Sequence, residues 1–190
     1  MRQAEIDKRN RLIDYAKRFD CKVFVETGTY KGDTVKAMLL SGLFDKIYSI
    51  DIFEDRAVHA QNRFKSFPNV DCRFGDSAVV LPEILNEIHE PALFWLDAHH
   101  SGKQIARTRG LVETPIAAEL DAVLDHPQAA DHVLLIDDAR YYEEFSKQYD
   151  NYPTTQALKD MILGKFPNWV FEIETDIIRA HRNEDHETTG

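Results

Sequence analysis

Residues 23–34, Val-Phe-Val-Glu-Thr-Gly-Thr-Tyr-Lys-Gly-Asp-Thr, constrain the fold more than any other part of the chain. Three apolar residues and an acid form a short strand pattern, a glycine turn follows, and a helix begins at about Asp33. In α/β folds such a turn presents backbone N–H groups at the carboxyl edge of a parallel sheet, where anionic or nucleotide-like ligands bind. We therefore expect a parallel sheet with a ligand site at this edge.

The rest of the chain alternates between helix and strand patterns. Apolar periodicity predicts helices at residues 6–19, 33–40, 54–66, 78–89 and 155–165, and another that Thr114 caps with Pro115 in its first position. Strands are predicted at residues 23–26, 46–51, 70–74, 92–97, 132–137, 169–174 and 177–181, the last two forming a hairpin that turns at Thr175 and Asp176.

This order predicts an α/β fold: a Rossmann-like, doubly wound, mostly parallel seven-stranded sheet with helices on both faces and a C-terminal antiparallel hairpin. At 190 residues the chain has the size of one domain, which we assign to residues 1–182, with a disordered tail at 183–190.

Composition limits the classes of partner. The net charge of −10 disfavours nucleic acid and anionic membrane surfaces. No apolar run is long enough to span a bilayer, and the N-terminus lacks the apolar core of a signal peptide. Cys21 and Cys72 show no zinc-binding or disulfide spacing, so we expect two free thiols and a cytoplasmic location.

Acidic residues follow every strand of the predicted parallel sheet: Glu26, Asp51, Asp76, Asp97 and the pair Asp137-Asp138. The carboxyl ends of parallel strands meet at one edge, so these side chains are expected to lie close together. A single acid at such a place often only caps a helix or a turn, but acids at five strand ends on one edge indicate a binding site.

The first half of this edge favours a nucleoside. Asp51 stands about 25 residues after the first strand, where an acid accepts hydrogen bonds from ribose hydroxyls, and Asp76-Ser77 is placed to meet an adenine ring. Tyr30 takes the place of the second glycine of a dinucleotide motif, which argues against a pyrophosphate. S-adenosylmethionine is the candidate that fits.

The second half favours a metal ion. Asp97, Asp137 and Asp138 offer hard oxygen ligands suited to Mg²⁺. The alternative is that Asp97 alone is functional and that the Asp137-Asp138 pair only caps the next segment. His99 and His100 follow Asp97 directly, and one of them could act as a general base or have no role.

Together these motifs resemble the class I S-adenosylmethionine-dependent methyltransferases over nearly the whole chain, and most closely the metal-dependent O-methyltransferases, the catechol and macrocin group. The glycine motif of that group, E-x-G-x-[FY]-x-G-Y-[ST], is matched by residues 26–34 except at Asp33. The resemblance implies cofactor contacts at Glu26, Thr27, Gly28, Thr29, Tyr30, Thr34, Asp51, Ile52, Asp76, Ser77 and Asp97.

The resemblance also implies a divalent cation on Asp97, Asp137 and Asp138. Catechol-type enzymes carry a lysine base three residues after the first aspartate, where this chain has His100. The group that removes the proton from the acceptor hydroxyl is thus His100, His99 or the metal itself, and Asp97 is the third catalytic candidate. We expect metal-assisted O-methylation of a small hydroxylated acceptor such as a sugar, a glycan or a specialised metabolite.

Several alternatives stay open. A non-catalytic nucleoside-binding module has no need of the three aspartates, and an NAD-linked oxidoreductase is disfavoured by Tyr30. Residues 101–113 form a long polar loop with three basic residues, which could act as a lid over an anionic or sugar-like acceptor. The tyrosines at 141, 142, 149 and 152 suit stacking on an acceptor, internal packing or a homodimer contact.

Overall fold

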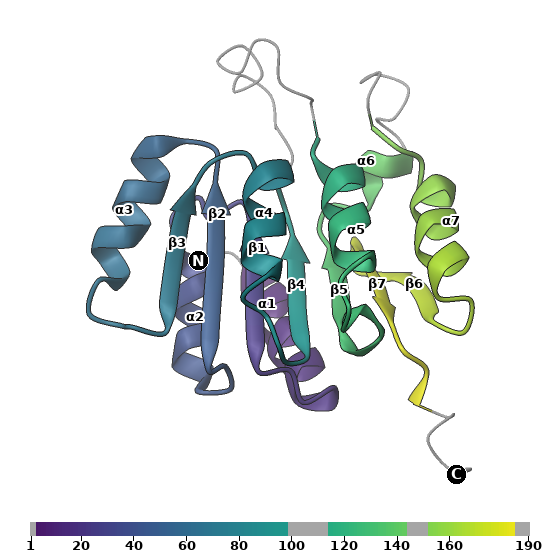
Figure 1. Ribbon diagram of the computed structural model, residues 1–190, viewed down its shortest axis with the longest axis horizontal. Helices are drawn as coiled ribbons and strands as arrows, with labels where there is room; N and C mark the ends of the chain where they lie inside the picture. Colours follow the sequence, from purple (N-terminus) through teal and green to yellow (C-terminus); the bar gives the residue numbers. More distant parts are fainter. Residues whose placement is uncertain (1–2, 99–113, 144–151, 185–190) are drawn as a thin grey trace.

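A computed structural model of the chain describes residues 3–98, 114–143 and 152–184. The described residues form one seven-stranded sheet in the order β3-β2-β1-β4-β5-β7-β6 (Figure 1). The strands are β1 (Val23–Thr27), β2 (Lys46–Asp51), β3 (Val70–Phe74), β4 (Ala92–Leu96), β5 (Val133–Ile136), β6 (Val170–Glu174) and β7 (Ile177–His181). The helices are α1 (Gln3–Arg18), α2 (Asp33–Ser41), α3 (Glu54–Phe64), α4 (Ser77–Leu85), α5 (Ile116–Leu124), α6 (Arg140–Glu143) and α7 (Thr155–Lys165), with a 3₁₀ turn at Ala129–Asp131.

The first five strands are parallel, and β7 enters antiparallel between β5 and β6. Thr175 and Asp176, both with positive φ, form the tight turn between β6 and β7. The predicted fold class is therefore confirmed, including the C-terminal hairpin.

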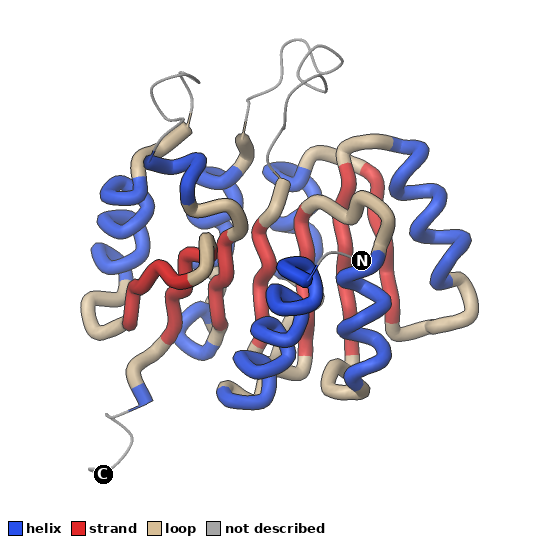
Figure 2. The backbone as a smooth tube through the Cα atoms, turned by 180° about the vertical axis from the view of Figure 1, so that it is seen from behind, coloured by secondary structure: helices blue, strands red, loops and turns tan. Residues whose placement is uncertain are grey.

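Two layers of helices cover the sheet. The apolar core on one face packs against α1, α2 and α3, which Figure 2 shows from behind, and the core on the other face packs against α4, α5 and α7. The central strands β1 and β4 are buried along their whole length, as is typical of parallel strands that helices cover on both faces. No helix among the described residues is long and apolar enough to cross a membrane.

The sheet topology places the site. The chain leaves β1 toward β2 on one side and returns to β4 on the other, so the crevice of a doubly wound sheet lies between β1 and β4. Thr27 lies in register with both Ile50 and Leu96. The parallel register therefore carries the carboxyl ends of β1, β2 and β4 to the same edge.

Some predicted helix ends move. The predicted helix at 54–66 ends at Phe64, and the one at 78–89 ends at Leu85. The second of these helices begins one residue earlier than predicted, at Ser77, because the Asp76 carboxylate accepts a hydrogen bond from the N–H of Ala78. The expectation that Thr114 caps a helix with Pro115 in its first position is one residue off. Helix α5 begins at Ile116, whose N–H donates to the Thr114 hydroxyl 3.4 Å away.

The tail prediction falls largely outside the described residues. Residues 185–190 are not described, whereas Glu184 forms an ion pair with Arg18 at 2.8 Å.

Candidate active site

Asp51 at the end of β2 is the best-defined acid of the site. Its two carboxylate oxygens accept hydrogen bonds from the N–H groups of Tyr30, 2.8 Å away, and Phe53, 2.9 Å away. Burial raises the pKa of Asp51, although the two backbone hydrogen bonds act in the opposite direction. Each oxygen keeps a lone pair, so the carboxylate is oriented and still able to accept hydroxyl groups.

The glycine turn after β1 brings the backbone close to β4. Gly28 has φ of 94°, and a Cβ atom at this position would stand 2.5 Å from the carbonyl oxygen of Asp97. Tyr30 also takes a left-handed conformation, with φ of 47°, and its side chain is 57% exposed. Only glycine fits at position 28 without moving the residue that carries the Asp97 carboxylate.

Four predicted cofactor ligands lie beneath the turn and not on the cavity wall. Glu26, Thr27 and Thr29 are buried, and the hydroxyl of Ser49 donates to Glu26 at 2.8 Å and pairs with the Thr29 hydroxyl at 2.6 Å. The Thr34 hydroxyl also hydrogen-bonds to Glu26, and burial raises the pKa of Glu26 to about 8. These residues support the turn, which is a structural role that the motif alone does not distinguish from ligand contact.

Thr27 additionally ties β1 to β4. The N–H of Asp97 donates to the Thr27 carbonyl at 3.1 Å and lies 3.3 Å from its hydroxyl. The backbone that carries Asp97 is thus fixed relative to the glycine turn.

The end of the site away from Asp97 lies between β2 and α4. Ile52, Asp76 and Ser77 all line it, with Asp76 serving at the same time as the N-cap of α4. Arg56 on α3 was missed by the sequence analysis. Its guanidinium carbon lies 5.0 Å from the centre of the Tyr30 ring and 4.5 Å from that of Phe53, so it forms part of the rim.

Asp97, Asp137 and Asp138 come together as predicted. One ligand oxygen from each lies within 4.8 Å of the others. Burial, followed by the charges of Asp137 and Asp138, raises the pKa of Asp97 well above its usual range. Burial and the charge of Asp138 likewise raise the pKa of Asp137. Three convergent carboxylates form a donor set that fits a hard divalent cation.

A lysine that the sequence analysis did not identify already contacts this cluster. Lys8 on α1 places its ammonium 2.5 Å from Asp137 and 3.4 Å from Asp138. Burial lowers the pKa of Lys8, but the nearby carboxylates outweigh this effect and the pKa is raised. The sequence carried a signal, because Lys8 precedes the buried Leu12 by one helical turn and so lies on the core-facing side of α1.

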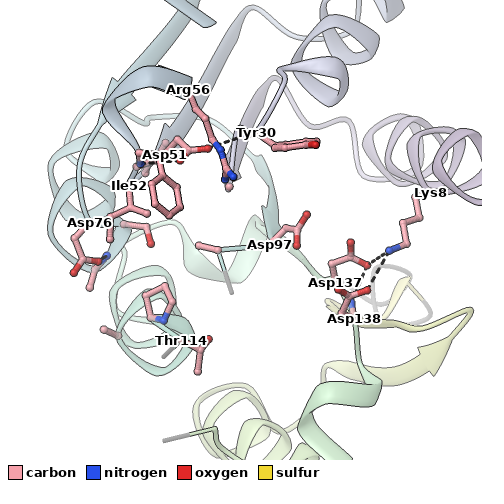
Figure 3. Close-up of a pocket in the computed structure, with 18 of the residues that line it drawn as sticks. Lys8, Tyr30, Asp51, Ile52, Arg56, Asp76, Asp97, Thr114, Asp137 and Asp138 are labelled. Atoms are coloured by element: carbon pink, nitrogen blue, oxygen red, sulfur yellow. Dashed lines mark hydrogen bonds and ion pairs between the residues drawn. The ribbon is translucent and has the colours of Figure 1, made fainter. Parts of the chain in front are cut away.

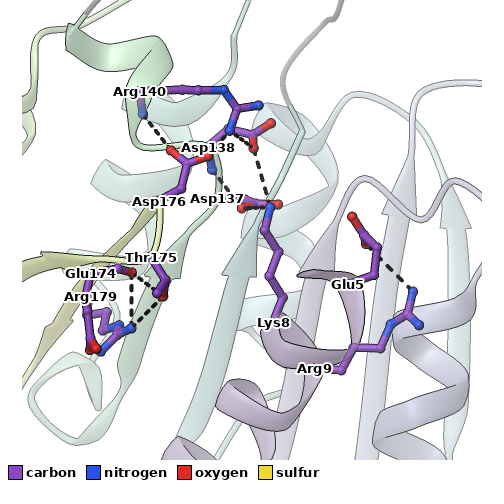
Figure 4. A network of polar contacts seen from close by, with 10 residues as sticks. All are labelled: Glu5, Lys8, Arg9, Asp137, Asp138, Arg140, Glu174, Thr175, Asp176 and Arg179. Atoms are coloured by element: carbon purple, nitrogen blue, oxygen red, sulfur yellow. Dashed lines mark hydrogen bonds and ion pairs between the residues drawn. The ribbon is translucent and has the colours of Figure 1, made fainter. Parts of the chain in front are cut away.

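A second cation links the cluster to the hairpin. Arg140 forms ion pairs with Asp138, at 2.9 Å, and with Asp176 in the turn between β6 and β7 (Figure 4). The Asp176 carboxylate also accepts a hydrogen bond from the N–H of Arg140 at 3.0 Å. Buried Arg179 holds the same turn through Glu174 and Thr175. The hairpin therefore builds one wall of the site.

His99 and His100, both predicted as candidate bases, lie outside the described residues, as does the polar loop at 101–113. Of the four tyrosines, Tyr149 also lies outside. Tyr142 and Tyr152 are buried, and their ring centres are 5.9 Å apart. These two side chains pack in the core, which leaves Tyr141 as the partly exposed member of the described set.

The two halves share one cavity of about 980 Å³. Figure 3 shows Asp51, Ile52 and Asp76 at one end, Asp97 in the middle and Asp137, Asp138 and Lys8 at the other end. Of the predicted site residues, the lining includes Gly28, Tyr30, Asp51, Ile52, Asp76, Ser77, Asp97, Asp137 and Asp138. The cavity falls in the size range of small-molecule and cofactor sites.

Comparison with known proteins identified no matching family model and no similar curated protein sequence. Solved structures do match. The methyltransferase PaMTH1 of Podospora anserina, bound to S-adenosylhomocysteine, has a TM-score of 0.61 at 17% identity, covering 93% of this chain and 78% of its own. An O-methyltransferase from Bacillus cereus, also with S-adenosylhomocysteine, has a TM-score of 0.59 at 18% identity, covering 93% and 81%.

The matches extend to other acceptors. The N-methyltransferase NodS from Bradyrhizobium japonicum has a TM-score of 0.54 at 12% identity and covers 95% of this chain and 97% of its own. At these identities the likeness establishes the architecture and not the acceptor. The chain has the Rossmann-like fold of S-adenosylmethionine-dependent methyltransferases.

Proposed function

We propose that the protein is an S-adenosylmethionine-dependent methyltransferase that methylates an oxygen of a small hydroxylated acceptor, with a divalent cation assisting. The acceptor class is a sugar, a glycan or a specialised metabolite. The observation that carries the proposal is the single cavity in which the Asp51 end and the Asp97 end meet beside Gly28.

The donor end suits an adenosine. Asp51 is held by two backbone N–H groups and is able to accept the ribose hydroxyls. Ile52, Ser77 and Asp76 line this end and would offer the base one apolar and two polar side chains. Tyr30 stands where a dinucleotide site has glycine, which favours a nucleoside without a diphosphate over NAD.

The acceptor end suits a polyhydroxylated molecule. Carboxylates of Asp97, Asp137 and Asp138 accept hydrogen bonds from hydroxyl groups, and Lys8 and Arg140 donate them. Residues of both charges on one wall favour a polar acceptor over an apolar one. The chain's net charge of −10 argues against a nucleic-acid acceptor.

Bound S-adenosylmethionine would supply a methyl group activated by the positive sulfonium, and a cation on the three aspartates would lower the pKa of the acceptor hydroxyl. The chain's own contribution is to hold the two partners. The turn at Gly28 fixes the distance between the donor end and Asp97, which is a proximity effect. Asp97 lines the cavity between the two ends, where its carboxylate would help to hold the cation beside the acceptor hydroxyl.

Calorimetry with S-adenosylhomocysteine and with NAD tests the donor assignment, and methyl transfer to pooled metabolites with and without Mg²⁺ tests the reaction. Binding of S-adenosylhomocysteine together with methyl transfer to an oxygen supports the proposal. Binding of NAD in its place refutes it. Methylated RNA as the sole product would refute the acceptor class but not the methyl transfer.

Substitution of the acidic cluster separates the two ends. Asp97→Ala or Asp137→Ala should abolish turnover and leave S-adenosylhomocysteine binding within about threefold of wild type. The exposed Asp45, in the loop before β2, provides the control as Asp45→Ala. Full activity in excess chelator would contradict the cation's part in the reaction.

A further inference from the structure

The acceptor end of the cavity contains a cation that belongs to the protein. The Lys8 ammonium contacts Oδ1 of Asp137 and Oδ1 of Asp138, two of the three carboxylates that would ligate a metal ion (Figure 3). Asp97 also acts on Lys8 through its charge. Two of the three aspartates therefore contact one ammonium group, and the third lies near enough for its charge to act on it.

The backbone presents Lys8 to this place. Leu12, Tyr15 and Ala16 of α1 are buried against the sheet, and Lys8 continues the same face one turn toward the N-terminus. From there the Lys8 side chain reaches Asp137, which directly follows β5 (Figure 4). On the face of α1 that Leu12, Tyr15 and Ala16 bury against the sheet, the next position toward the N-terminus is thus a lysine whose side chain is 20% exposed.

A divalent cation among the three carboxylates would stand close to the Lys8 ammonium. A hard divalent cation binds carboxylate oxygen at about 2.0–2.6 Å, and Lys8 already stands in hydrogen-bond contact with Oδ1 of Asp137. A divalent cation and an ammonium group this close repel strongly in a partly buried site. Asp138 keeps Arg140 as a partner when Lys8 leaves, so the carboxylate stays oriented.

We propose that Lys8 is a positioning residue that holds the acidic cluster in the absence of metal, and that a divalent cation binds there only by displacing the Lys8 ammonium. The inference rests on the proposed function for the cation's role in methyl transfer. The competition itself concerns only the ion and this chain.

Manganese binding, followed by the loss of the free-ion signal in electron paramagnetic resonance, measures the competition. Lys8→Met should raise the Mn²⁺ affinity by about tenfold or more, and Lys8→Arg should stay within about threefold of wild type because it restores the positive charge. Lys17→Met, an exposed position on the same helix, is the matched control and should leave the affinity unchanged. Equal affinities in wild type and Lys8→Met, or no Mn²⁺ binding by either, would overturn the proposal.

A second measurement needs only the wild-type protein and remains decisive if Lys8→Met does not fold. Acetylation of lysine amines, read by mass spectrometry, should be slow at Lys8 without metal and about tenfold faster with saturating Mn²⁺, while Lys17 stays constant. An acetylation rate at Lys8 that Mn²⁺ does not change would overturn the competition.

Calorimetry with S-adenosylhomocysteine on the same samples separates this inference from the proposed function. Intact binding of S-adenosylhomocysteine with no change in metal affinity refutes the role of Lys8 alone. If the wild type does not bind S-adenosylhomocysteine, the proposed function is refuted, whatever the Mn²⁺ affinities are.

Discussion

Replacing Gly28 with alanine should destabilise the protein through one identifiable contact. The added Cβ would stand 2.5 Å from the Asp97 carbonyl oxygen, and φ of 94° is unfavourable for any residue with a Cβ. The backbone conformation costs about 1–2 kcal/mol. Overpacking against a fixed backbone atom adds about 1–3 kcal/mol. Gly28→Ala should therefore lower the free energy of unfolding by about 2–5 kcal/mol.

Gly42→Ala is the matched control, because Gly42 also has a positive φ, of 67°, but a Cβ there would meet no atom within 4 Å. It should cost only the conformational part, about 1–2 kcal/mol. Urea unfolding followed by circular dichroism gives both values, and thermal midpoints should fall by about 2–4 °C for each kcal/mol. Equal losses in the two variants would show that the contact with β4 carries no energy and would refute the reasoning.

Two further predictions concern pH, in opposite directions. Burial raises the pKa of Glu26 to about 8, so the folded protein keeps a proton that the unfolded chain loses above about pH 4.5. The free energy of unfolding should therefore fall as pH rises from about 4.5 to about 8. Urea unfolding at a series of pH values should show a flatter dependence in Glu26→Gln than in the wild type. An unchanged slope in Glu26→Gln would contradict the buried, protonated state. Burial, with a contribution from the charge of His126, lowers the pKa of His132 to about 3. As pH falls below about 6.5, His132 gains a proton in the unfolded chain but stays neutral in the folded protein. The free energy of unfolding should therefore decline from about pH 6.5 toward about pH 3. His132→Asn should reduce that decline, and equal acid sensitivity in the variant would show that other groups cause it.

The sheet could be predicted because its residues carry local signals. The apolar run of residues 92–97, the glycine turn at Gly28 and the acids after each strand follow the chain's own periodicity, and parallel register then brings Asp51 and Asp97 to one edge. Strand ends were predicted to within about a residue for this reason. The start of α4 moved by one residue because the Asp76 side chain caps the helix.

The residues that the sequence analysis missed depend on contacts between distant segments. Lys8 meets Asp137 across 129 positions, and Arg140 meets Asp176 across 36. Neither pairing follows from periodicity, because it depends on where α1 and the hairpin turn lie relative to the sheet edge. Thr27 and Thr29 show the reverse case: the motif marked them as ligand contacts, whereas their hydroxyls hydrogen-bond to neighbouring strands.

The central claim is that Asp51 and the glycine turn hold the adenosine part of a methyl donor, and calorimetric titration of S-adenosylhomocysteine into wild type, Asp51→Asn and Asp45→Asn tests it most directly. Asn keeps one acceptor oxygen but removes the charge, and one charged hydrogen bond is worth about 1.5–3 kcal/mol. The account predicts one binding site in the wild type, an affinity at least about tenfold weaker in Asp51→Asn, and no change in Asp45→Asn. Absence of binding in the wild type, or equal affinity in all three proteins, would contradict it.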